Sequence, residues 1–229
     1  MARDWFRSPG WTALDREDFE TRLKRARPTS RPQYLRIKAL SIEEETPEGA
    51  EELFRRVIAD YAEHWPELAF AHERLGDLRI RAGDDRTAED HYRLALATSP
   101  TLSGTTGEVH LKLGELLLDR NGPTDEVYAM LDAAKRHMTL NKSVFRWHVL
   151  AAKAGRASGD RTTAAASAVI ALELLDAPPQ FSRHPNVGLA EADQHVISML
   201  RELAAGRGTQ QGSRRSWIRR RGAHPSPHD

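Results

Sequence analysis

Ten histidines are the residues of this 229-residue chain with the clearest potential to bind a metal ion. His72, His110 and His148 recur at a spacing of 38 residues, which would place them at equivalent points of repeated elements. Neighbouring packed helices lie about 10 Å apart, whereas the ligands of one ion must lie about 2 Å from it. We therefore interpret the three imidazoles as packing groups, and we expect neither a metal site nor a cofactor.

Other residues with catalytic potential form no recognisable pattern. The chain has no cysteine, which excludes a cysteine nucleophile, a cysteine zinc site and disulfides. It contains no glycine-rich phosphate loop and no G-x-S-x-G or H-E-x-x-H motif. Asp84, Asp85 and the run Glu43 to Glu45 fall at expected turns and helix starts, where carboxylates cap free amides. We identify no catalytic residue and expect a protein that is not an enzyme.

The chain has a net charge of +1, but its charged residues are unevenly distributed along the sequence. Residues 1–38 and 206–229 are basic, whereas residues 39–205 carry an excess of acidic residues. Of the 34 basic residues most are arginine, so the number of arginines alone does not indicate nucleic acid. The last segment nevertheless has the chemistry to hold phosphates and to stack a base, through Arg214, Arg215, Trp217, Arg219, Arg220 and Arg221.

The elements that would position any site are indicated by a sequence period of 38 residues. Apolar and small residues recur within each copy at i, i+3, i+4 and i+7, which is the spacing of an amphipathic helix. Each copy therefore predicts two helices joined by a turn. Three columns show the period: Ile37, Leu75, Leu113 and Ala151; then Leu40, Leu78, Leu116 and Ala154; then Ala50, Ala88, Glu126 and Ala164.

The turns lie in the same register as the helices. Asp84 and Asp160 stand where an N-cap of the second helix is needed, and Gly83 and Gly159 precede them. Thr46-Pro47 and Gly122-Pro123 occupy the equivalent positions in the first and third copies, and Pro is accepted in a first helical turn. Turn chemistry and periodicity thus predict the same helical hairpins.

The second copy resembles a tetratricopeptide repeat. Residues 72–78 read His-Glu-Arg-Leu-Gly-Asp-Leu, and Gly83-Asp84, Ala88, Tyr92, Ala95 and Pro100 follow at the family's positions. The copies from 107 and 145 are similar through Leu113-Gly114 and through Gly159-Asp160, Ala164, Ala168 and Ala171. The period differs from the family's 34-residue unit, and the family's tryptophan is replaced by Tyr34, His72, His110 or His148.

This resemblance implies an all-α fold, a right-handed α-α superhelix of about four helical hairpins with a capping helix at each end. We expect an N-terminal leader and capping helix in residues 1–30 and four tetratricopeptide-like hairpins in residues 31–182. A C-terminal capping helix is expected in residues 183–205, with Leu189, Val196 and Leu203 on its apolar face. Residues 206–229 are expected to be a basic, disordered tail.

In tetratricopeptide folds the first helices of successive repeats line a concave groove that binds proteins or peptides. The family's groove positions run here from apolar, through acidic, to basic residues, so a matching peptide would have an apolar stretch, a basic middle and an acidic end. Ile42, Ile80 and Leu118 could instead belong to the core. The groove positions are Leu35, Ala39, Phe70, Glu73, Asp77, Glu108, Leu111, Glu115, Arg146, Val149, Lys153 and Arg156.

Three functions are compatible with these observations. The leading hypothesis is a non-enzymatic scaffold or adaptor that binds a protein or peptide partner in the groove. The alternatives are a nucleic-acid-associated factor that uses the basic tail, and a regulatory subunit of a larger enzyme or defence complex. No apolar run reaches the roughly 20 residues of a membrane span and the N-terminus lacks a signal peptide, so a cytoplasmic location is expected. The pathway and the oligomeric state stay open.

Overall fold

The computed structural model describes residues 4–206 of the chain. These residues form α-helices and short 3-10 helices and contain no strand, which confirms the all-α class. Within the described residues, no helix is long and apolar enough to cross a membrane. The helices are α1 (Ala13–Arg25), α2 (Arg31–Ile42), α3 (Pro47–Asp60), α4 (Trp65–Arg81), α5 (Asp85–Thr98), α6 (Val109–Asp119), α7 (Thr124–Ala134), α8 (Asn141–Ser158), α9 (Arg161–Leu175) and α10 (Gln194–Ala204).

The predicted turns before α5 and α9 are confirmed by their caps. The Asp84 carboxylate accepts a hydrogen bond from the Thr87 amide at 3.2 Å, and Asp160 accepts one from the Thr163 amide at 3.0 Å. Gly83 and Gly159 lie at the ends of α4 and α8 with φ of +73° and +80°. This left-handed conformation favours glycine, which explains the residue type at both positions.

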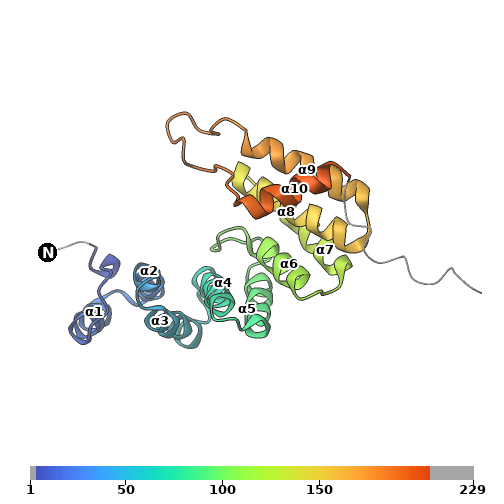
Figure 1. Ribbon diagram of the computed structural model, residues 1–229. Helices are drawn as coiled ribbons and strands as arrows, with labels where there is room; N and C mark the ends of the chain where they lie inside the picture. Colours follow the sequence, from blue (N-terminus) through green and yellow to red (C-terminus); the bar gives the residue numbers. More distant parts are fainter. Residues whose placement is uncertain (1–3, 207–229) are drawn as a thin grey trace, which may run out of the picture.

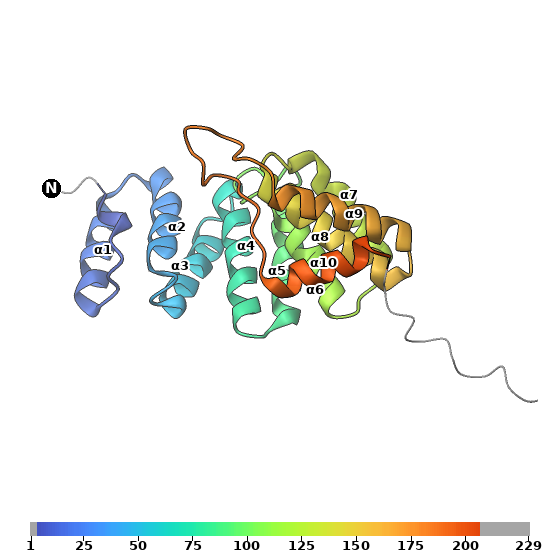
Figure 2. The same cartoon turned by 45° about the horizontal axis from the view of Figure 1, so that its top comes forward.

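Each helix from α2 to α10 packs against the next one along the chain (Figure 1). The helices α2, α4, α6 and α8 are the first members of four consecutive pairs. Among them α2 also packs on α4, and α6 on α8, while α10 packs on α8 and α9. Figure 2 shows the pairs following one another from α1 at one end to α8–α10 at the other. The loop of residues 99–108 joins α5 to α6, and its side chains contribute to the site described below.

Three clusters of buried apolar residues follow each other along the chain. The first lies among α1–α4, the second among α5–α8 and the third among α8–α10. The N-terminal segment joins the first cluster, since Trp5, Phe6 and Trp11 pack with Phe19 and the following helices. Within residues 4–206 the buried apolar residues therefore form three successive clusters and not one central core.

A buried lysine fixes the N-terminal segment. Lys38 of α2 is only 2% exposed, and its Nζ donates hydrogen bonds to the carbonyl oxygens of Ser8 at 2.7 Å and Gly10 at 2.8 Å. Its ammonium also lies over the rings of Trp11 and Phe19. Burial lowers the pKa of Lys38, because the charged form loses its hydration. The segment before α1 is thus tied to α2 by a desolvated cation.

The C-terminal helix α10 spans Gln194–Ala204 and is shorter than the capping helix that we expected in residues 183–205. It begins at Gln194, where the Asp193 carboxylate accepts a hydrogen bond from the Val196 amide at 2.8 Å. Residues 183–193, including Leu189, lie in the loop between α9 and α10, where Pro185 and the left-handed Gly188 are incompatible with a continuous helix. The basic tail that we expected from residue 206 onward, with its arginines and Trp217, lies outside the described residues from position 207.

Candidate functional site

Two cavities lie along the face formed by the first helices and α10. The central cavity, about 440 Å³, is lined mainly by α4, α6 and α8, and the C-terminal cavity, about 470 Å³, by α6, α8 and α10. Asp119 lines both cavities. The central cavity is lined by Arg74, Asp77, Ile80, Arg81, Asp85, Tyr92, Lys112, Glu115, Leu116, Asp119 and Arg146. The C-terminal cavity is lined by Leu118, Asp119, Asn121, Lys153, Arg156, Ala157, His195, Val196, Ser198, Met199 and Glu202.

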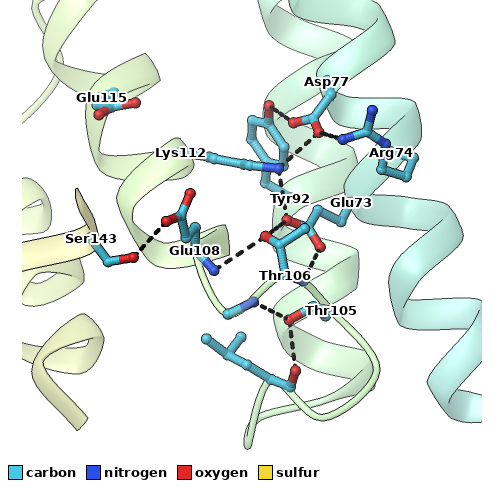
Figure 3. Close-up of polar contacts among 12 residues, drawn as sticks. Glu73, Arg74, Asp77, Tyr92, Thr105, Thr106, Glu108, Lys112, Glu115 and Ser143 are labelled. Atoms are coloured by element: carbon cyan, nitrogen blue, oxygen red, sulfur yellow. Dashed lines mark hydrogen bonds and ion pairs between the residues drawn. The ribbon is translucent and has the colours of Figure 1, made fainter. Parts of the chain in front are cut away.

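A glycine in α4 allows Tyr92 to reach the central cavity. A Cβ atom on Gly76 would stand 2.5 Å from the Tyr92 ring, so the absence of a side chain lets α5 bring this ring against α4. The Tyr92 hydroxyl then donates a hydrogen bond to Asp77 at 2.8 Å (Figure 3). Burial, followed by the negative charge of Asp77, raises the pKa of Tyr92, so the hydroxyl stays protonated and remains a donor.

Lys112 joins α6 to α4 through two carboxylates. Its Nζ lies 2.7 Å from Glu73 and 2.8 Å from Asp77, and Figure 3 shows it extended between them. The Glu73 carboxylate has no exposed surface and also accepts hydrogen bonds from the Thr106 amide, at 2.8 Å, and the Thr106 hydroxyl. A carboxylate without hydration requires such partners, because burying it unpaired would be costly. The loop between α5 and α6 is thereby fixed on α4.

The same arrangement of charges continues from α6 to α8. The Arg146 guanidinium donates to Glu115 at 2.7 Å and to Glu108 at 2.9 Å, and the Ser143 hydroxyl donates to Glu108 at 2.7 Å. Burial alone would raise the pKa of Glu108, but the Ser143 hydrogen bond and the charge of Arg146 outweigh it and lower the pKa. Glu108 is therefore held ionised between the two helices.

Arginine pairs carry the network in the other direction, from α4 to the end of α2. Arg74 donates to Glu43, with one N–O distance of 3.0 Å, and to Asp77 at 2.7 Å. Arg81 also pairs with Glu43, whose side chain is only 4% exposed. The inter-helix pairs from Glu43 to Arg146, which we call the ion-pair network, thus connect α2, α4, α6 and α8. Each of its cations is already bound to at least one carboxylate.

The predicted groove residues fall into three groups. Leu35, Ala39, Phe70 and Leu111 are buried in the core and Val149 packs against the C-terminal core cluster, so a partner on the surface cannot rest on a groove made of these five. Leu35 and Ala39 are covered because α1 and the N-terminal segment pack on α2. The charged positions that the structure brings together in the ion-pair network are Glu73, Asp77, Glu108, Glu115 and Arg146.

Lys153 and Arg156 form the third group. Both line the C-terminal cavity, and neither forms an ion pair with any residue in the 4–206 range. Asp119 and Glu202 line the same cavity without contacting them at ion-pair distance. Of the cations at the basic end of the predicted groove, Arg146 is paired within the network, whereas Lys153 and Arg156 remain available to another molecule.

Several network residues were not predicted from the sequence. The clearest are Lys112 and Arg74, which occupy one column of the 38-residue period together with Arg36. A repeated cation beside the acidic column of Asp77 and Glu115 was a signal for pairing between successive copies. Tyr92, Thr106 and Ser143 carried no comparable signal, because their hydrogen bonds depend on how the loops and helices pack.

The three recurring histidines have separate neighbours. His72 Nδ1 lies 3.1 Å from His91 Nδ1, His110 stacks on His137, and His148 lies edge-on to Trp147. Nowhere between residues 4 and 206 do three or more His, Asp or Glu side chains gather in a way that could hold a metal ion.

The ion-pair network binds charges of this chain to one another, and the two cavities offer polar and apolar surface to a ligand. Comparison with known proteins adds no assignment: no protein-family model and no curated protein matches the chain.

Proposed function

We propose that this chain is a non-enzymatic adaptor that binds a peptide segment of a partner protein on the face formed by α4, α6, α8 and α10. In this proposal the four helix pairs are a tetratricopeptide-like right-handed superhelix with capping helices at both ends, and this face is its concave side. The supporting observation is the pair of cavities that share Asp119 and are built from helices far apart in sequence. Their neighbouring positions suit an extended or helical ligand better than a single small molecule.

The available charges define the ligand. A partner that paired with Glu73 would have to displace Lys112, and removing one member of such a buried ion pair costs about 3–5 kcal/mol. Glu115 is likewise already paired with Arg146, in a partly exposed contact. The acidic middle of the predicted groove is therefore already neutralised, and the expectation of a basic middle in the ligand loses its basis. Lys153 and Arg156 have no such internal partner, so an acidic residue of the ligand is placed at the C-terminal cavity.

The apolar residues that line the cavities indicate which other side chains the ligand should have. Ile80 and Leu116 line the central cavity, and Leu118 lines the C-terminal cavity next to Asp119. Ile80 is 39% exposed, so it offers apolar surface to a ligand. The ligand that fits is a segment with apolar side chains over α4 and α6, followed by Asp or Glu beside α8 and α10.

The test uses a phage-displayed library of random peptides, panned on the full-length chain. Enriched peptides are then synthesised with a fluorescent label, and their Kd is measured by anisotropy for the wild type and for Lys153→Glu/Arg156→Glu. We expect Asp or Glu beside apolar residues in the enriched peptides, and at least about a tenfold weaker Kd for the double variant.

A matched control carries the same charge change elsewhere. Lys24→Glu/Arg25→Glu alters two exposed cations of α1 that line neither cavity. This double variant should leave the Kd unchanged. Enrichment of no peptide, or equal affinity for the wild type and Lys153→Glu/Arg156→Glu, would contradict the proposal. Arg146 is left intact in this experiment, since its loss would disrupt the ion-pair network.

A further inference from the structure

Of the described residues, only Asp119 lines both the central and the C-terminal cavity. It is the last residue of α6, its side chain is exposed, and it forms no ion pair with any residue from 4 to 206. The following residue, Arg120, pairs instead with Glu89 of α5. A peptide that reaches from one cavity to the other therefore passes a carboxylate whose charge is not neutralised.

The 38-residue period explains why Asp119 lacks a partner. The equivalent positions of the four copies are Glu43, Arg81, Asp119 and Ala157. Arg81 of the second copy pairs with Glu43 of the first, across one period. Asp119 belongs to the third copy, and the fourth copy has Ala157 at this position, whose methyl group cannot pair with a carboxylate. Ala157 is exposed and lines the C-terminal cavity, so the position that would supply the cation is part of the cavity wall.

The end of α6 adds to the negative potential at Asp119. The C-terminal end of a helix carries a partial negative charge, which basic residues in the last turn offset. The first helices on either side have such residues, Arg79 and Arg81 in α4 and Arg156 in α8. The last turn of α6 has no basic residue. A cation beside Asp119 therefore meets both the carboxylate and the negative end of α6.

The other carboxylates of the two cavities are less suited to bind a cation of the ligand. Asp77 and Glu115 each pair with a cation of the ion-pair network. Asp85 lies in the first turn of α5, where the positive end of the helix offsets its charge. Glu202 of α10 lines the C-terminal cavity but not the central one. Asp119 is thus the carboxylate that stands between the apolar part of the face and its unpaired cations.

We propose that Asp119 binds a lysine or arginine side chain of the peptide, where the peptide passes from the central to the C-terminal cavity. This inference rests on the proposed function and adds a third feature to its ligand. The order along the peptide is apolar residues over α4 and α6, a basic residue at Asp119, and an acidic residue at Lys153 and Arg156. Packed helices lie about 10 Å apart and an extended chain advances about 3.3 Å per residue, so the acidic residue follows the basic one by about three positions.

A charge exchange between chain and peptide tests the inference. One peptide enriched on the full-length chain is synthesised with its basic residue unchanged, and with this residue replaced by Gln or by Glu, and each Kd is measured by anisotropy. For the wild-type chain the Glu peptide should bind at least about fivefold more weakly than the unchanged peptide, because like charges would be brought together. For Asp119→Lys the order should reverse, with the Glu peptide at least about fivefold tighter than the unchanged one.

Asp176→Lys is the matched control. Asp176 is an exposed carboxylate at the C-terminal end of α9 and lines neither cavity. The same charge reversal at this position should leave the wild-type preference among the three peptides unchanged. Far-ultraviolet circular dichroism verifies that both variants keep their helices.

The outcomes separate this inference from the proposed function. Enriched peptides without a basic residue, or the same preference in the wild type and Asp119→Lys, would overturn the role of Asp119. If binding still depended on Lys153 and Arg156, the proposed function would stand. Tighter binding of the unchanged peptide by Asp119→Asn would also overturn the inference, since Asp119 would then compete with the ligand for these cations. The enrichment of no peptide would overturn both proposals.

Discussion

Replacing Lys112 by Met removes the cation that joins α6 to α4. Lys112 is only 12% exposed and lies 2.7 Å from the fully buried Glu73 and 2.8 Å from Asp77. Met keeps a similar volume and apolar stem, so the change isolates the charge. The Glu73 carboxylate then retains the hydrogen bonds from Thr106 but no cation within ion-pair distance among the described residues.

The size of the effect follows from the contacts that remain. Removing one partner of a buried ion pair costs about 3–5 kcal/mol, and the bonds that Glu73 and Asp77 keep reduce this to about 2–4 kcal/mol. In a chain of this length 1 kcal/mol shifts the melting temperature by about 2–4 °C, so Lys112→Met should melt about 4–16 °C lower than the wild type.

The assay is thermal and urea unfolding, followed by circular dichroism at the helix band. Lys24→Met is the matched control, because Lys24 is exposed and forms no ion pair within the 4–206 range; it should change the free energy of unfolding by no more than about 0.5 kcal/mol. Equal stability of Lys112→Met and Lys24→Met would show that the contact between Lys112 and the two carboxylates does not stabilise the packing of α6 on α4.

Three further perturbations test other contacts. The pKa of His72 is lowered to about 4, chiefly by burial and then by the charge of His91. Between this value and about 6.5 the unfolded chain binds a proton at His72 that the folded chain does not bind. The free energy of unfolding should therefore fall as the pH drops from about 6.5 towards 4, by up to about 3 kcal/mol from His72. Unfolding in urea across this range should show a smaller decrease for His72→Phe, and an identical pH dependence would contradict the assignment. Gly76→Ala should lower the free energy of unfolding by about 1–3 kcal/mol, because the new Cβ would stand 2.5 Å from the Tyr92 ring. Gly83→Ala has free space around the new Cβ but a φ of +73°, so it should lower the free energy of unfolding by about 1 kcal/mol in the same assay. Lys38→Met should release the N-terminal segment, so that trypsin cleaves after Arg7 at least about tenfold faster; an unchanged cleavage rate would show that the Ser8 and Gly10 contacts do not hold it.

Local features of the fold were predictable because their causes lie within a few residues. The caps at Asp84 and Asp160 and the left-handed glycines before them act on the adjacent helix ends, so the sequence located the starts of α5 and α9. The α9–α10 loop was placed less well, because Leu189 continues the apolar spacing although Gly188 and Pro185 interrupt the helix. The tetratricopeptide resemblance stays a prediction about the superhelix.

The candidate site was harder to predict, because its contacts join residues of different helix pairs. Arg74 and Glu43 are 31 residues apart, as are Arg146 and Glu115, and only the packing of successive helices brings them together. A family pattern assigns Leu35 and Ala39 to a groove, but it contains no information on the N-terminal segment that covers α2 in this chain. The charges of Lys153 and Arg156 were found by sequence position, whereas their lack of internal partners required the structure.

The most direct test of peptide recognition at the C-terminal cavity is chemical-shift mapping by NMR. A uniformly labelled chain would be titrated with an acidic peptide selected from the library, and backbone and side-chain shifts would be followed along α4, α6, α8 and α10. The largest changes should fall at Lys153, Arg156 and His195, with small changes at the paired charges Glu73 and Lys112. Changes confined to α3 and α5, or largest at Glu73 and Lys112, would contradict it.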